Sequence, residues 1–376
     1  MAVTKKESIL WRAVLALPLL GLAVTAFHVM DVRPVLKAAK AMRDGGKLVL
    51  GGANGGAEVN VVRKFYGFEG FDDFVAEVNM FFVPGMYGLS PQCRRQMLTF
   101  ITEGTNLLLI WTFESARRAN NNGFNILQFP NLFTLIGQLL GIGVLSPLWC
   151  FLQYVFSPME KYAARDQRLT RTRWSFASLP AILVAFLLPF YGFILSPDLE
   201  TRQHLLFIWQ LYPVYLSVTL FILSRFFKDN SNDSLTNTEK DLPVVKFYIG
   251  ASSLLGAAWW ISNTWLGAGI IENFIPTDIP PRAFNAGTLT FQDFLVQFMR
   301  WDGVFAFGSH LLWMAYQFWD LKTAGMLEEG WLRVVGLMLA GVPVVGPGAS
   351  LGMAWLFREN ILATRTRNRV VHKKTA

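Results

Sequence analysis

The stretch FITEGTNLLLIWTFESARR (residues 100–118) has the apolar content of a membrane-spanning helix, yet it places Glu103 in its interior. Glu114, Arg117 and Arg118 follow at its end. A charged side chain in the bilayer interior costs about 3 kcal/mol or more, and an acid found there is by default a candidate functional residue. The stretch therefore predicts a membrane helix and raises the question of what Glu103 does.

Composition supports the membrane interpretation. The chain has 376 residues, of which 53% are hydrophobic and only 16% are charged. A soluble protein of this size carries about 25% charged residues. The charges also fall between long apolar runs. These features predict an all-α, polytopic integral membrane protein whose residues 1–376 form one domain.

Eight segments meet the criterion of about 20 apolar residues for a spanning helix. They cover residues 9–29, 96–116, 131–156, 174–196, 203–227, 244–266, 301–321 and 331–357. The last contains GVPVVGPGAS (residues 341–350), whose two prolines predict a kink or an unwound stretch. The first can instead be a secretory signal peptide, because two lysines precede it and VTA (residues 24–26) resembles a cleavage site.

Residues 31–95 form a predicted non-spanning segment. Its first part contains GGKLVLGGANGG (residues 45–56), which predicts a loop. FYGFEGFDDFVAEVNMFFVPGMYG (residues 65–88) has apolar residues at helical spacing and predicts a helix that lies in the membrane interface. LTFQDFLVQFMR (residues 289–300) predicts a second interfacial helix, and residues 358–376 form a basic tail.

Few motifs of metal or nucleotide chemistry occur in the chain. The four histidines and two cysteines are too scattered for a zinc or haem site, and Walker A, GxSxG and HExxH are missing. Asp229 and Asp233 have the DxxxD spacing with which membrane prenyltransferases hold magnesium diphosphate. They lie among Asn and Ser, however, which favours a solvated turn. We therefore expect no metal and no cofactor.

Acidic residues form two stripes along predicted helices. Glu103 and Glu114 are eleven residues apart, which leaves them about 20° apart around a helix. The span at 301–321 carries a second stripe of Asp302, Ser309, Trp313 and Asp320. Taken singly, such acids can be helix-end charges in the headgroup zone, satisfied by a nearby cation or by water. Two stripes together favour a central cavity with a proton-active wall.

Aromatic residues are expected to complete the lining of this cavity: Trp111, Trp209, Tyr212, Trp259, Trp260, Trp265, Trp301, Trp313, Tyr316 and Trp319. A carboxylic acid in apolar surroundings stays protonated and can protonate an epoxide or an alkene. Facing rings stabilise the resulting carbocation, and exclusion of water prevents its premature capture. An apolar isoprenoid would reach such a site from the bilayer.

Six ordered blocks carry a family resemblance. They are FYGFEGFDDFVAEVNMFF (65–82), LLLIWTFESARRANN (107–121), SLPAILVAFLLPF (178–190), FIWQLYP (207–213), RWDGVFAFGSHLLWMA (300–315) and GPGASLGMAWLFRE (346–359). With them the chain resembles the fungal membrane-bound meroterpenoid cyclases typified by the ascofuranone terpene cyclase. The resemblance implies a metal-independent and cofactor-independent enzyme that cyclises an epoxidised farnesyl chain on an aromatic compound. It also implies a set of recurring polar positions: Asp72, Glu114, Arg117, Arg118, Trp209, Gln210, Trp301 and Asp302.

These observations assign expected roles. Asp302 and Glu114 are the proton donor and the final base, in either order, and Arg117 or Arg118 pairs with Glu114. Asp72 caps the cavity from the interfacial helix. The substrate-binding set is Arg117, Arg118, Trp209, Gln210, Trp301, Ser309 and Trp313. Glu103 lies outside the family pattern and stays a catalytic candidate, although we expect it to be structural.

The partners that we expect are a lipophilic farnesylated aromatic substrate and the lipid bilayer, with no nucleic acid. The expected location is the endoplasmic reticulum membrane, crossed several times. A proton-coupled transporter is the main alternative, because intramembrane acids and a broken helix suit that function as well. No internal repeat is apparent in the sequence, which argues against a transporter.

Overall fold

The computed structural model describes residues 8–51, 57–120, 125–162, 168–228 and 241–374, and most of them belong to helices. The first half contains α1 (Ile9–Leu15), α2 (Leu17–Val29), α3 (Leu36–Asp44), α4 (Glu69–Asn79), α5 (Val83–Met86), α6 (Pro91–Ala116), α7 (Pro130–Leu140), α8 (Ile142–Phe156), α9 (Thr172–Ile182) and α10 (Leu188–Leu195). The second half contains α11 (Leu199–Gln210), α12 (Tyr212–Ser224), α13 (Asp241–Asn263), α14 (Ile270–Phe274), α15 (Pro280–Asn285), α16 (Phe291–Thr323), α17 (Trp331–Val345) and α18 (Pro347–Lys374).

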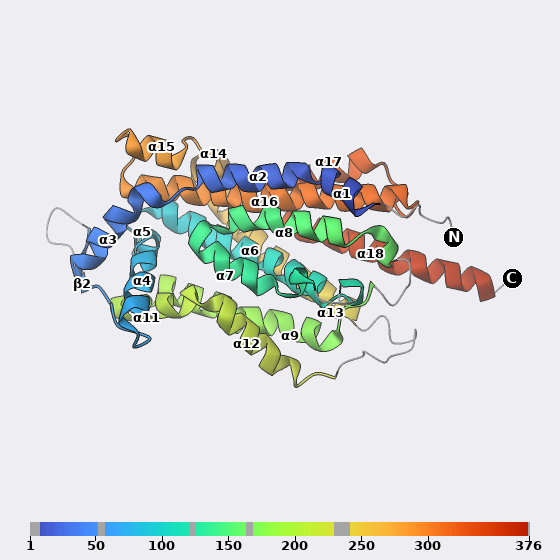
Figure 1. Cartoon of the computed structure of the whole chain (residues 1–376), viewed down its shortest axis with the longest axis horizontal. Coiled ribbons are helices and arrows are strands. Elements are labelled where there is room, and N and C mark those ends of the chain that lie inside the picture. Colours follow the sequence, from blue (N-terminus) through green and yellow to red (C-terminus); the bar gives the residue numbers. More distant parts are fainter. Residues whose placement is uncertain (1–7, 52–56, 121–124, 163–167, 229–240, 375–376) are drawn as a thin grey trace.

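The long helices run side by side as an elongated bundle (Figure 1). Helix α16 packs on α8, α6 packs on α13, and α2 covers α8. Helices α3, α4 and α5 gather at one end of the bundle, and both chain ends lie at the other. The segment at 31–95 thus closes one end of the helical bundle.

Helix α16 is a single rod of 33 residues. It begins with a capping box in which Thr290 Oγ1 accepts from the N–H of Asp293 at 3.2 Å and the Asp293 side chain accepts in return. This cap satisfies backbone donors that a helix start leaves free. The interfacial helix predicted at 289–300 and the span predicted at 301–321 are therefore one element, and the prediction of two was wrong.

Besides the span at 9–29, which divides into α1 and α2 at Ala16, three predicted spans are broken. The span at 131–156 divides into α7 and α8 at Gly141, whose φ of 87° is a conformation that favours glycine. The span at 203–227 divides into α11 and α12, which meet at an angle of 69°. The predicted break in the last span is confirmed, because α17 ends at Gly346 (φ 93°) and α18 begins with Pro347. The first two breaks were not predicted.

Within the described parts of the chain, three helical segments are long and apolar enough to cross a membrane, namely Leu17–Asp44, Thr172–Leu195 and Asp241–Gly267. The bent pair α11 and α12 makes a fourth if it counts as one span. Eight spans are therefore not confirmed. Helices α6 and α16 have sufficient length, at 26 and 33 residues, but acids and other polar residues lie along them.

Residues 47–60 contain a β-hairpin that was not predicted. Strands β1 (Lys47–Leu50) and β2 (Ala57–Asn60) pair antiparallel, with Leu48 opposite Val59. These two side chains are buried while most of their neighbours are exposed, which is the alternation of a half-buried strand. The loop prediction was wrong for 47–50, and its residues 52–56 lie outside the described residues, as do Asp229 and Asp233. The helix predicted within 65–88 is confirmed as α4.

Candidate active-site cavity

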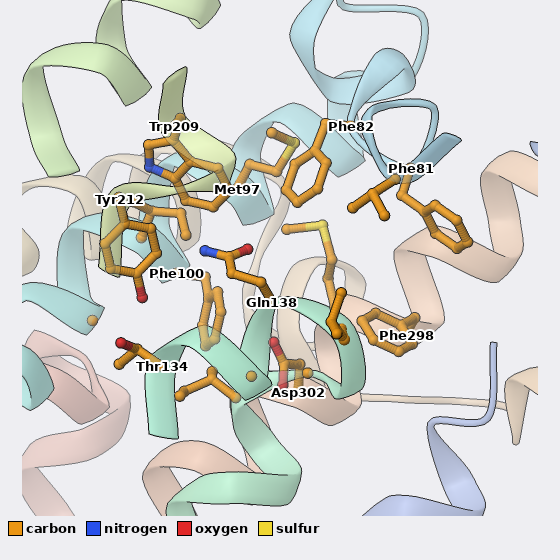
Figure 2. A pocket seen from close by; sticks show the side chains of 18 of the residues that line it. Phe81, Phe82, Met97, Phe100, Thr134, Gln138, Trp209, Tyr212, Phe298 and Asp302 are labelled. Atoms are coloured by element: carbon orange, nitrogen blue, oxygen red, sulfur yellow. The ribbon is translucent and has the colours of Figure 1, made fainter. Parts of the chain in front are cut away.

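A cavity of about 290 Å³ lies inside the bundle, close to the end that α4 covers. Helices α6, α7 and α16 supply most of its wall, and Phe74 and Val78 of α4 close one side. Nine aromatic residues line it: Phe74, Phe81, Phe82, Phe100, Trp111, Phe186, Trp209, Tyr212 and Phe298. Figure 2 shows several of these rings facing a common space. Such a mainly apolar pocket with a few polar groups is typical of a small-molecule site.

Asp302 supplies the one carboxyl group among the described lining residues. It projects from α16 and is only 7% exposed. Its Oδ1 accepts the N–H of Gly143 at 2.5 Å, in the first turn of α8. A helix N-terminus stabilises negative charge. No arginine or lysine is among the described residues that line the cavity, so this end of α8 is the main support for the carboxylate.

Two glycines permit this contact between α8 and α16. A Cβ at Gly143 would lie 2.9 Å from both the carbonyl oxygen and Oδ1 of Asp302. A Cβ at Gly141 would lie 3.0 Å from the same Oδ1. Both distances are shorter than ordinary contacts, so larger residues would displace the carboxyl group. The break between α7 and α8 therefore positions Asp302 at the cavity wall.

Trp209 forms the wall opposite Asp302 (Figure 2). Its ring centroid lies 5.3 Å from that of Phe82 and 5.5 Å from that of Tyr212. The face of an aromatic ring attracts cations, and tryptophan does so most strongly. This wall can stabilise positive charge that develops on a bound apolar molecule.

Trp111, another wall residue, is fixed from behind by His310. Its Nε1–H donates to His310 Nε2 at 2.7 Å, and His310 Nδ1 lies 2.7 Å from the carbonyl oxygen of Ala306. Nδ1 therefore carries the ring proton and Nε2 is the acceptor. Trp149 stacks on Trp111 with ring centroids 4.9 Å apart. His310 was missed by the sequence analysis, although a lone histidine in an apolar helix was a visible feature.

Glu114 lies outside the cavity lining, in a buried cluster of charges. It accepts from Arg117 Nε at 2.8 Å and from Arg358 Nη1 at 3.0 Å. The predicted pairing of Glu114 with Arg117 is confirmed. Trp355 and Gln153 also donate to its carboxylate, so both of its oxygens are engaged. This cluster joins α6 to α18 and includes Arg358, the first residue of the predicted basic tail.

Other predicted substrate-binding residues also lie outside the lining. Trp313 is buried and donates to Gln153 Oε1 at 2.6 Å, and the Ser309 hydroxyl donates to the Ala306 carbonyl at 3.0 Å. Trp301 donates to the Asp278 carbonyl at 2.8 Å. Arg118, which donates through its backbone to Leu169, and Gln210, at the end of α11, are likewise outside the lining. The structure thus brings together four of the residues predicted for the cavity, Asp302, Trp209, Trp111 and Tyr212. The other aromatic residues predicted to line it are not among the described lining residues: Trp259, Trp260, Trp265, Trp301, Trp313, Tyr316 and Trp319.

Asp72 holds the turn before α4. Its carboxylate accepts the backbone N–H groups of Phe65 (3.1 Å), Tyr66 (2.7 Å) and Gly67 (3.0 Å). Burial works to raise the pKa of Asp72, but these three donors, together with the N–H of Phe68, outweigh it and hold that pKa below its usual range. A carboxylate used in this way is a poor proton donor. The cap over the cavity comes instead from Phe74 and Val78 on the same helix.

Glu103 caps a helix. Its Oε2 accepts the N–H of Gly348 and, at 3.3 Å, the N–H of Ala349, both in the first turn of α18. Its Oε1 has no hydrogen-bond partner within the described parts of the chain. Added Cβ atoms at Gly346 or Gly348 would lie within 3 Å of the carboxylate, so the glycines admit it. A buried acid in α6 thus satisfies the helix start created by the GPG break.

A family model described as the CtvD domain matches residues 13–363 of the chain. The chain belongs to the CtvD family. One relative is named terpene cyclase ctvD and comes from Aspergillus terreus. It is 22% identical to this chain, and the match covers 76% of this chain and 83% of ctvD. No solved structure matches the chain.

Two relatives have a different name and greater length. FAD-dependent monooxygenase verC1 from Penicillium polonicum is 33% identical, and FAD-dependent monooxygenase anuJ from Penicillium roqueforti is 32% identical, each over 96% of this chain. The matches cover 44% and 42% of these two proteins. The CtvD-family chain therefore spans less than half the length of these curated relatives. The relative ctvD is thus named a terpene cyclase, whereas verC1 and anuJ are named monooxygenases.

Proposed function

We propose that the chain is a membrane terpene cyclase that opens an epoxide on the farnesyl chain of a meroterpenoid and folds that chain into a ring. The observation that carries the proposal is the placement of Asp302. This carboxyl group lies in an aromatic cavity and is held by the N-terminus of a helix. No lysine or arginine is among the described residues that line the cavity. That arrangement suits an acid that donates a proton to a neutral, apolar substrate.

The reaction begins with proton transfer from the Asp302 carboxyl group to the epoxide oxygen. The adjacent carbon–oxygen bond breaks, and the carbon becomes cationic while the oxygen becomes a hydroxyl group. An alkene of the same chain attacks this carbon, a carbon–carbon bond forms, and the positive charge moves to the alkene's other carbon. The aromatic walls around Trp209 stabilise the cation. The Gly143 N–H and the start of α8 stabilise the carboxylate that remains.

The final proton loss needs a base at the cavity. We assign it to the Asp302 carboxylate, which regains the proton that it gave. Glu114, the other candidate, is outside the lining and its oxygens already accept from two arginines. Substrate and product are then isomers of equal mass, and the acid is regenerated.

Support for a bilayer location comes from the surface. Leu266, Leu254 and Phe247 of the α13 region are 81%, 74% and 68% exposed, and Leu332 and Leu337 of α17 are 75% and 65% exposed. Soluble monomers rarely expose large apolar areas. We propose that these helices face lipid in the endoplasmic reticulum membrane and that the substrate enters from the bilayer.

The two relatives named monooxygenases favour an epoxide as substrate. Among the residues that the structure describes, strands form only the β1–β2 hairpin, whereas dinucleotide cofactors usually bind a parallel α/β sheet. We propose that the flavin chemistry of verC1 and anuJ belongs to the part of those proteins that this chain does not match. A flavin monooxygenase would then supply the epoxide, either as a fused part or as a separate enzyme.

A proton-coupled transporter is the second candidate. Two broken helices each meet an acid at the break, because Asp302 contacts the start of α8 and Glu103 contacts the start of α18. Transporters also place half-helix N-termini at their binding sites. Proteoliposomes with a pH-sensitive dye inside separate the two functions, since a transporter alone would move protons when a lipophilic solute is added.

The test of the cyclase is direct. Microsomes that contain the protein are incubated with a phenol that carries a farnesyl epoxide, and the products are separated by chromatography and mass spectrometry. We expect a new compound of the same mass, absent from microsomes without the protein, and its formation should continue in EDTA. Recovery of the substrate alone, or activity that requires added magnesium, would contradict the proposal.

A further inference from the structure

Gln138 is a polar residue of the cavity with no assigned role. It lies in the last turn of α7, three residues before the break at Gly141. Figure 2 shows its side chain reaching into the middle of the cavity, with Asp302 on one side and Trp209 and Tyr212 on the other. Its amide forms no hydrogen bond with any described residue.

An amide in apolar surroundings is costly unless it is paired. An amide that leaves water without a new partner loses the hydrogen bonds that water supplied, and the half-buried Gln138 faces mainly apolar side chains. Two other polar side chains of the lining have protein partners, since the Thr134 hydroxyl donates to the Asn131 carbonyl at 3.0 Å and Trp111 donates to His310 at 2.7 Å. The Nε1–H of Trp209 has no partner among the described residues, as is also true of the Gln138 amide. Gln138 therefore retains its full hydrogen-bonding capacity for a molecule inside the cavity.

The carboxyl group of Asp302 can also form a further hydrogen bond. Its Oδ1 accepts from Gly143, and no described residue hydrogen-bonds its Oδ2. Gly141 links the two groups, because it ends the helix that carries Gln138 and packs against the Asp302 carboxyl group. The break between α7 and α8 thus brings an amide and an acid to the same part of an otherwise apolar wall.

We propose that the Gln138 amide binds the epoxide oxygen of the substrate and holds it against Asp302. The inference rests on the proposed function and extends it to substrate positioning. An epoxide oxygen has two lone pairs, so it can accept a proton from Asp302 and a hydrogen bond from the amide N–H together. That bond persists as the oxygen becomes a hydroxyl group, and it selects the substrate that carries the oxygen at the correct end of the chain.

The test compares two ligands that differ by one oxygen atom, the farnesyl-epoxide phenol and the corresponding alkene. Their dissociation constants are measured in detergent by quenching of tryptophan fluorescence, in the Asp302→Asn background so that the epoxide is not consumed. Gln138→Met removes the amide at nearly constant size. We expect the dissociation constant of the epoxide to rise about tenfold, as loss of one hydrogen bond allows, and that of the alkene to change less than twofold.

A control and a second variant complete the design. Leu140→Met changes an exposed residue in the same turn, outside the lining, and should leave both dissociation constants unchanged. If Gln138→Met does not fold, Gln138→Leu replaces it. Equal weakening of both ligands, or no weakening of either, would overturn the role of Gln138.

Turnover separates this inference from the proposed function. With Asp302 intact, Gln138→Met should lower kcat/KM for the epoxide by at least tenfold. A parent protein that binds the epoxide through Gln138 but never converts it refutes the cyclase and leaves the positioning role standing. Normal turnover in Gln138→Met refutes the positioning role and leaves the cyclase standing.

Discussion

Replacement of Gly143 by alanine tests how closely Asp302 must be held. The new Cβ would lie 2.9 Å from the carbonyl oxygen and from Oδ1 of Asp302, and 3.1 Å from its Cα. An ordinary contact is about 3.5–4.0 Å, so α8 and α16 must separate by roughly 0.5–1 Å. The backbone of α16 cannot yield as a flexible side chain would. The hydrogen bond from the Gly143 N–H to the carboxylate lengthens or breaks in consequence.

The expected losses of turnover and stability in Gly143→Ala follow from this displacement of Asp302. A misplacement of about 1 Å in a catalytic group can lower the rate about a hundredfold. Overpacking costs about 1–3 kcal/mol of stability, from which the higher helix propensity of alanine recovers up to about 1 kcal/mol. Gly143→Ala should therefore fold with a modestly lower melting temperature and lose most of its turnover.

The assay measures isomer formation per folded molecule, with folded protein counted by gel filtration in detergent. Gly308→Ala is the matched control, because Gly308 lies on α16, the helix of Asp302, and nothing is within 4 Å of its added Cβ. It should keep full activity and gain slight stability. If Gly143→Ala retains the activity of the parent, close contact between α8 and Asp302 is unnecessary, and our account of how the acid is positioned fails.

Three further predictions concern buried polar groups. Glu114→Gln removes the charge that balances Arg117 and Arg358, so thermal unfolding should show that the free energy of unfolding falls by about 3–5 kcal/mol. An unchanged yield and melting temperature would contradict the structural role of Glu114. Glu103→Gln should be tolerated. Glu103→Leu should destabilise the protein by about 1–3 kcal/mol because the start of α18 loses its acceptor. Equal stability of the two variants would refute the capping role. His310→Phe removes the acceptor of the Trp111 N–H, so the ratio of cyclic products, measured by chromatography, should change. An unaltered ratio would show that the orientation of Trp111 does not guide the cation.

Some of the site could be predicted because it depends on local sequence. Asp302 was found as an acid in a long apolar helix, and Pro343 and Pro347 predicted the break before α18. The pairing of Glu114 with Arg117 followed from a spacing of three residues within one helix. Each of these features needs only a few neighbouring residues.

The features of the site that could not be predicted depend on contacts between segments that are distant in the sequence. Glu103 and Glu114 share one face of α6, but they contact different parts of α18, its first turn through Gly348 and its middle through Arg358. The angle around a helix gives the face that a residue occupies and not the partner that it meets. Gln138 escaped notice because it is a single polar residue in an apolar run, and only the packing of α7 against distant helices shows that it lines a cavity.

Asp302→Asn tests the central claim most directly. The substitution keeps the shape of the side chain and an oxygen that can accept the Gly143 N–H, but it removes the transferable proton. Isomer formation from the farnesyl-epoxide phenol is compared with that of the parent and of Glu329→Gln, which changes an exposed acid. We predict that Asp302→Asn folds normally and loses at least a hundredfold in turnover, as expected for the loss of a general acid, while Glu329→Gln keeps full activity. A well-folded Asp302→Asn protein that forms the isomer at the parent rate would show that the proton comes from another group.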